Sequence, residues 1–202
     1  MQLKTKVKVG NITNLSDARY CAGMGVGLLG FPISNPDGSL LSPEKFADIT
    51  GWVSGPEFVI EVPGSELSTS YKIIENYSAH YIQLDAAHCE LFDPAYIEQL
   101  IIALDIHEWE KWKKKIEAIK SKASYLLIRN SQESNPVDFL KVLAEMSQHV
   151  PLLLNFGIEK AKLPEILQLP IAGIALNGSE EEKPGMKDYD QLADILEALE
   201  TE

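Results

Sequence analysis

The sequence predicts a (β/α)8 barrel, the eight-stranded parallel α/β fold, built as a single domain from residues 1–202. Eight short apolar runs recur along the chain, and each ends in a polar residue followed by turn residues and a helical pattern. Alternating strands and helices form a parallel sheet with helical crossovers, and near-continuously apolar strands suit a sheet that is buried on both faces. An open, doubly wound sheet is the alternative architecture.

The eight predicted strands follow one another at regular intervals. In order they read VKVGN, LLGFPISN, FVIEV, YIQLD, LIIALD, YLLIRN, PLLLN and IAGIALN. Their polar ends are Asn11, Asn35, Glu61, Asp85, Asp105, Arg129 (or Asn130), Asn155 and Asn177. Eight units in about 200 residues lie at the lower size limit of the barrel, and in a barrel these ends share the rim where such enzymes place their sites.

Helical patterns fill the segments between the strands. They cover residues 16–24, 42–49, 65–77, 94–99, 107–122, 136–148, 162–167 and 187–199. Asn14 or Ser16 is expected to cap the first helix, and Pro43 suits the first turn of the second. Cys21 is expected to be a core residue, and Trp109 and Trp112 are expected to pack a helix against the barrel.

The composition of the chain argues against nucleic-acid, membrane and metal partners. The chain is 45% apolar and carries a formal charge of −12, with KWKKK (111–115) as its one basic cluster, so nucleic acid is not an expected partner. The longest apolar runs are far shorter than the roughly 20 residues of a membrane helix, and no signal sequence opens the chain, so we expect a cytoplasmic protein without a membrane partner. The two cysteines and four histidines show no metal-ligand spacing, so neither a metal nor another cofactor is expected.

Two stretches carry a resemblance to a known family. KVGNITNLSDA (8–18) and GIALNGSEEEKPGMKD (173–188) resemble the phosphoribosylanthranilate isomerases of tryptophan biosynthesis, whose sequences begin K-I-C-G-I-T-x-x-x-D-A and end G-V-D-V-S-S-G-V-E-x-x-P-G-x-K-D. GLLGF, SPEKFADI, IQLD and PLLLNFGI match further family segments in the same order. The resemblance spans nearly the whole chain and implies a (β/α)8 barrel. It also implies an Amadori rearrangement that opens a ribosylamine ring, which needs a general acid and a general base.

The family's catalytic residues are replaced at the matching positions. The base of the family is a cysteine, and the alignment places Gly10 there. The acid is an aspartate at the end of the sixth strand, where this chain has Ile128 or Arg129, depending on a one-residue choice of register. Ser39 matches a family arginine and Asp85 a family histidine. Because each missing acid or base lowers a rate by about 10²- to 10⁴-fold, the substitutions predict that isomerase activity is weak or absent.

The rim still offers residues that suit a small ligand. By resemblance, a phosphate would meet backbone N–H groups near Gly157 and at Gly178 and Ser179. Arg129 either holds a carboxylate or phosphate or forms a salt bridge with Asp105 or Asp85. The predicted ligand-binding residues are Asn11, Asp85, Arg129, Asn155, Gly157, Asn177, Gly178 and Ser179.

Three functions therefore compete. The first is a phosphoribosylanthranilate isomerase that works through substituted residues. The second is a catalytically silent barrel, a pseudoenzyme that binds a phosphorylated small molecule or has a regulatory role. The third is an enzyme of altered specificity that uses Asp85, Asp105 or Arg129. His88 and Cys89, in the loop after the fourth strand, are a further candidate for a displaced catalytic pair. The expected assembly is a monomer or a homodimer.

Overall fold

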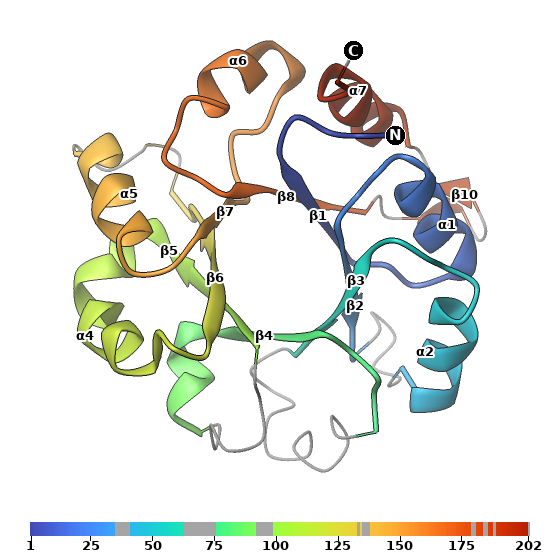
Figure 1. Cartoon of the computed structure of the whole chain (residues 1–202), viewed down its shortest axis with the longest axis horizontal. Helices are drawn as coiled ribbons and strands as arrows, with labels where there is room; N and C mark the ends of the chain where they lie inside the picture. The colour runs from blue at the N-terminus through green and yellow to red at the C-terminus, as the bar shows by residue number, and fades with distance from the viewer. Residues whose placement is uncertain are drawn as a thin grey trace.

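The computed structural model is a closed barrel of eight parallel strands in chain order, in which β1 pairs with both β2 and β8 (Figure 1). The structure describes residues 1–34, 41–62, 76–91, 99–132, 134, 138–178, 181–183, 186–187 and 189–201. The strands are β1 (Lys6–Gly10), β2 (Leu28–Pro32), β3 (Glu57–Glu61), β4 (Tyr81–Asp85), β5 (Leu100–Asp105), β6 (Ala123–Arg129), β7 (Leu152–Leu154) and β8 (Gly173–Asn177). The predicted fold class is confirmed, and the open sheet is excluded.

Helices surround the barrel on its outside (Figure 1). The α-helices are α1 (Leu15–Gly23), α2 (Pro43–Thr50), α4 (Trp109–Ile119), α5 (Phe139–Ser147), α6 (Leu163–Ile166) and α7 (Asp190–Ala198). Short 3-10 helices occur at η2 (Ala86–Leu91), η4 (Ile106–Glu108) and η5 (Lys160–Lys162). Most of the helices predicted at 65–77 and 94–99 lie outside the described residues.

Local sequence signals set the starts of the first two helices. The Asn14 side chain accepts a hydrogen bond from the Asp17 amide at 2.9 Å, which satisfies one of the free N–H groups at the start of α1. Ser42 Oγ accepts from the Lys45 amide at 3.2 Å, and Pro43 occupies the first turn of α2. Both predicted helix starts are confirmed, with Asn14 as the cap of α1.

Other predicted boundaries were wrong by a few residues. The pattern expected a helix over 107–122, but Asp105 caps the His107 amide at 2.9 Å, the first turn is the 3-10 helix η4, and α4 ends at Ile119. The last helix was expected from Lys187, which instead belongs to a two-stranded antiparallel sheet of β9 (Glu181–Lys183) and β10 (Met186–Lys187). The helix α7 consequently begins at Asp190.

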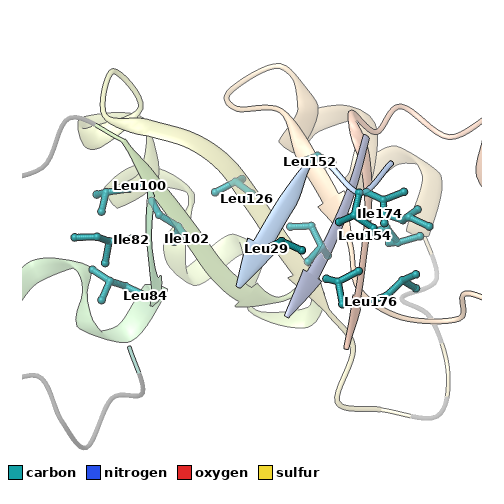
Figure 2. Packing of buried hydrophobic residues seen from close by; sticks show 14 of the residues in the cluster. Leu29, Ile82, Leu84, Leu100, Ile102, Leu126, Leu152, Leu154, Ile174 and Leu176 are labelled. Atoms are coloured by element: carbon teal, nitrogen blue, oxygen red, sulfur yellow. The ribbon is translucent and has the colours of Figure 1, made fainter. Parts of the chain in front are cut away.

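The core consists of two layers because side chains alternate across each strand. The larger layer lies between the strands and the surrounding helices, and Figure 2 shows part of it, including Leu84, Ile102 and Leu154. Cys21, Trp109 and Trp112 belong to this layer, as predicted. The smaller layer fills the inside of the barrel with Leu28, Val59, Tyr81, Ile101, Ala103, Leu127, Leu153 and Ala175. Among the described helices, none combines the length and the apolar character needed to cross a bilayer.

Candidate ligand site at the barrel mouth

Polar side chains gather at the carboxyl ends of the strands, one layer above the apolar interior. Five predicted strand ends coincide with the last residue of the observed strand. These are Glu61, Asp85, Asp105, Arg129 and Asn177. Asn155 directly follows β7, Asn11 follows β1, and Asn35 lies outside the described residues. The sequence pattern therefore identified the mouth of the barrel correctly.

A buried ion pair between β1 and β3 closes the bottom of this mouth. Lys8 Nζ donates to Glu61 Oε1, and the two side chains are 2% and 17% exposed. Glu61 Oε2 accepts a second hydrogen bond, at 3.1 Å, from the amide of Asn11. Asn11 has φ +58°, a left-handed conformation that asparagine tolerates better than most residues, and this turn directs its amide at the carboxylate. Both carboxylate oxygens of Glu61 thus have partners within the protein.

Two glycines make room for this ion pair. A Cβ atom on Gly10 would lie 2.6 Å from Glu61 Oε1 and 3.2 Å from Lys8 Nζ. A Cβ atom on Gly30 would lie 2.7 Å from Glu61 Cδ and 2.8 Å from Lys8 Nζ. These separations are shorter than van der Waals contact, so any side chain at either position requires the ion pair to move. The space that a side chain at position 10 would enter is filled by the Glu61 carboxylate.

The second ion pair of the mouth lies across the barrel. Arg129 Nη2 donates to Asp85 Oδ1, and the side chains are 47% and 35% exposed. The predicted alternative of a salt bridge to a neighbouring aspartate is confirmed for Asp85. Ile128 is fully buried in the outer layer, whereas Arg129 lines the mouth, so Arg129 is the mouth-facing residue at the end of β6.

A cavity of about 340 Å³ lies between the two ion pairs, and we call it the central cavity. A volume of this size falls in the range of small-molecule sites, about 300–1,000 Å³. It brings together Asn11, Arg129, Asn155, Asn177 and Gly178, five of the eight predicted ligand-binding residues. Lys8, Glu61 and Gln83 also line it. Gln83 Oε1 is buried, and the described part of the chain offers it no hydrogen-bond donor.

A second hollow, the β4–β6 cavity, has a volume of about 690 Å³ and is lined by Asp85, His88, Asp105, His107, Arg129 and Ser131 among others. Asp105 accepts hydrogen bonds from the amides of His107 at 2.9 Å and Ser131 at 2.6 Å. Burial raises the pKa of the Asp105 carboxyl, but hydrogen bonds from Ser131 and His107 outweigh this and hold the pKa below its usual value. Asp105 is therefore ionised at neutral pH and holds two backbone groups in place.

The surroundings of Cys89 disfavour the predicted reactive pair with His88. The Cys89 thiol lies 3.6 Å from the Asp85 carbonyl oxygen, its hydrogen-bond acceptor. Burial, together with the charge of Asp85, raises the pKa of the Cys89 thiol to about 12. Because the thiolate is the nucleophile, a protonated Cys89 is unreactive at neutral pH. Among the described residues, no group of His, Cys, Asp and Glu side chains is arranged to hold a metal ion.

A third hollow, the β7–β8 cavity, lies at the phosphate position that the family resemblance implies. It has a volume of about 360 Å³ and is lined by Asn155, Phe156, Gly157, Asn177, Gly178 and Gln191 among others. Gly157 has φ +64°, the left-handed turn expected of a glycine. The Gly178 amide donates to the Gly10 carbonyl at 2.8 Å, and Asn155 Nδ2 donates to the Ala175 carbonyl at 2.8 Å. One of the expected backbone donors, the Gly178 amide, is therefore engaged within the barrel, as is the Asn155 side chain, and Ser179 lies outside the described residues.

Sequence reasoning missed the roles of Lys8, Glu61 and Gln83. Lys8 carried a usable signal, since it is a charged residue inside the apolar run VKVG and shares the inward-facing side of β1 with Gly10. A buried lysine requires a partner, and Glu61 was one of three carboxylates among the polar strand ends, with Asp85 and Asp105. The sequence held no information on which of them lies within reach.

The fold and the mouth together define a class: a single-domain (β/α)8 barrel with ligand-sized cavities at the carboxyl ends of its strands, which is where barrel enzymes bind their substrates. No family model and no curated protein matches the sequence.

Solved structures similar to this chain include phosphoribosylanthranilate isomerases. The enzyme from Thermus thermophilus is 22% identical with a TM-score of 0.67, and the enzyme from Thermotoga maritima is 17% identical with a TM-score of 0.71. Each match covers 96% of this chain and 98% of the isomerase. A truncated 3-deoxy-D-arabino-heptulosonate 7-phosphate synthase from Thermotoga maritima is 15% identical, has a TM-score of 0.62, and is matched over 95% of this chain and 83% of its own. At these identities the similarity establishes a shared fold, and that fold serves more than one activity.

Proposed function

We propose that this barrel binds a phosphorylated small molecule at its mouth and does not catalyse the isomerisation of phosphoribosylanthranilate. The observation that carries the proposal is the filling of position 10. The family resemblance places the catalytic base there, but this chain has glycine, and the Glu61 carboxylate occupies the space with both oxygens engaged.

The second part of the proposal concerns the acid. The position that resembles the family's aspartate faces the mouth as Arg129. A guanidinium is not deprotonated in proteins, so Arg129 does not release a proton to the ring oxygen as a general acid must. Arg129 is instead suited to hold an anion. Binding of a phosphorylated compound is supported by the names of the similar proteins, which refer to a phosphoribosyl compound and a heptulosonate 7-phosphate.

The decisive experiment is an isomerase assay of the purified protein on phosphoribosylanthranilate, with the Thermus thermophilus enzyme as positive control. We expect no turnover above background, and no rescue of a tryptophan auxotroph that lacks the isomerase. Growth of that auxotroph at the normal rate would refute the loss of activity. Binding is tested separately by measuring the free energy of unfolding with and without a phosphorylated compound. A ligand at 100 times its dissociation constant should raise this free energy by about 2.7 kcal/mol.

The position of Glu61 also supports a second candidate, an isomerase that uses this carboxylate as its base. Glu61 Oε1 lies 2.6 Å from the position that a Cβ atom on Gly10 would take, so a carboxylate from β3 stands close to the place of the family's thiol. This candidate requires measurable isomerisation in the wild-type protein and its loss in Glu61→Gln. Absence of wild-type turnover eliminates it.

A further inference from the structure

We infer that the ligand is a small hydroxylated oxyanion whose charged group binds Arg129 at the end of β6, and not the loops after β7 and β8. This inference rests on the proposed binding function and specifies its site. The chemistry shared by the expected ligands is a phosphate or carboxylate on a compound that carries several hydroxyl groups.

Charge distinguishes the two cavities that compete for the anion. The central cavity is lined by two cations, Lys8 and Arg129, and by one carboxylate, Glu61. Each cation is paired with a carboxylate, Lys8 with Glu61 and Arg129 with Asp85, and the Arg129–Asp85 pair is the more exposed of the two. None of the described residues that line the β7–β8 cavity is charged. Of the two cavities, as lined by the described residues, the central cavity alone offers an anion a cationic hydrogen-bond donor with an exposed partner, Arg129.

The donors of Arg129 point to the same cavity. The Gly178 amide and the Asn155 side-chain amide line both cavities and already bond to the carbonyls of Gly10 and Ala175, so they favour neither. Arg129 presents five N–H groups, and its bond to Asp85 is made through Nη2. A planar guanidinium binds phosphate or carboxylate in a bidentate manner, and an exposed partner such as Asp85 is easily displaced or shared.

The acceptors in the central cavity indicate that the ligand carries hydroxyl groups. Gln83 Oε1 is buried, and the described residues supply it with no donor. A buried acceptor without a partner lowers stability, and a ligand hydroxyl that donates to Gln83 removes this penalty. Glu61 accepts one bond on each oxygen and retains lone pairs for another donor. Gln83 and Glu61 thus suit the hydroxyl groups of a ligand, while Arg129 suits its anionic group.

Calorimetric titration of the full chain with D-ribose 5-phosphate, D-ribonate and D-ribose tests this assignment. The wild-type protein should bind at least one of the two anions more tightly than ribose, and the comparison of phosphate with carboxylate identifies the preferred group. Arg129→Met should raise the Kd for that anion by about 10- to 100-fold, since it removes a charge-assisted contact. Arg19→Met, which alters an exposed arginine on α1, is the matched control and should leave the Kd unchanged.

Three further variants separate binding at Arg129 from binding at the β7–β8 cavity. Asp85→Asn should lower the Kd, because it frees Arg129 from its carboxylate, and a purely structural role of Arg129 does not predict tighter binding. Gly157→Asp places a carboxylate at the β7–β8 cavity, where a Cβ meets no atom within 4 Å, and Gly157→Asn is its neutral match at the same positive φ. We expect equal Kd values for this pair. Weaker binding in Gly157→Asp than in Gly157→Asn, with Arg129→Met unaffected, would overturn the assignment to Arg129. Failure of the wild-type protein to bind any of the three compounds would instead count against the proposed binding function itself.

Discussion

Two ion pairs face each other across the mouth of this barrel, and they differ mainly in burial. Lys8 and Glu61 are 2% and 17% exposed, whereas Arg129 and Asp85 are 47% and 35% exposed. Removing one member of a buried pair leaves an uncompensated charge, while water and salt screen the members of an exposed pair. The same combination of charges thus forms a buried, fixed contact on one side of the mouth and a solvent-exposed contact on the other.

The largest effect is expected from breaking the buried pair. Glu61→Leu leaves the Lys8 ammonium without its carboxylate, so the free energy of unfolding should fall by about 3–5 kcal/mol, measured by urea denaturation. The double variant Lys8→Met/Glu61→Leu removes both charges and should regain most of this loss. A single variant that is no less stable than the double variant would show that the pair does not act as a buried unit.

The next effect concerns the glycine beside that pair. Gly10→Cys restores the residue type of the family pattern, but its Cβ would lie 2.6 Å from Glu61 Oε1, so it should lower stability by about 1–3 kcal/mol without creating isomerase activity. In a Glu61→Ala background the same substitution should be much less harmful, which a double-mutant cycle measures. Gly23→Ala on α1 is the control, since no atom lies within 4 Å of its Cβ and stability should not fall. Additivity of the Gly10 and Glu61 substitutions would contradict the steric coupling.

The effect expected at Asp105 lies between those of the two ion pairs, because its carboxylate binds backbone amides and not a cation. Asp105→Ala should lower stability by about 0.5–2 kcal/mol at pH 7, through loss of the bonds from the His107 and Ser131 amides. Since folding lowers the pKa of Asp105, its contribution is complete above the unfolded pKa of about 3.9. The contribution is then lost as the pH falls through the lower pKa of the folded state. The stability difference from wild type should therefore shrink below about pH 4. A difference that is constant from pH 7 to pH 2.5 would argue against an ionised cap.

The smallest effect is expected at the exposed pair. Arg129→Met and Asp85→Asn should each change the free energy of unfolding by at most about 1 kcal/mol, and 1 M salt should reduce that change further. Thermal or urea unfolding of both variants measures it. A loss of unfolding free energy as large as that of Glu61→Leu would show that Arg129 stabilises the fold as strongly as the buried pair does, and the contrast between the two pairs would be wrong.

Much of the fold was accessible from local signals. The alternation of apolar runs and helical patterns predicted all eight strands. The cap at Asn14 or Ser16 and the proline Pro43 predicted two helix starts, because caps, first-turn prolines and strand periodicity depend on neighbouring residues. The sheet of β9 and β10 escaped prediction because its segments are only three and two residues long. The choice between Ile128 and Arg129 also stayed open, since a one-residue shift in alignment exchanges the two faces of a strand.

The sequence by itself determined the eight-fold barrel, the position of its mouth and the absence of a side chain at Gly10. Only the tertiary structure decided that Glu61, 53 residues away from Lys8, lies in the space beside Gly10, and that Gly30 also leaves room for it. It likewise decided that Arg129 pairs with Asp85 and not with Asp105. The physical reason is that local patterns fix which residues face inward, because side chains alternate along each strand. Which long side chain meets which across the mouth depends on strand register and on the space left by glycines, and these exist only once the barrel has closed.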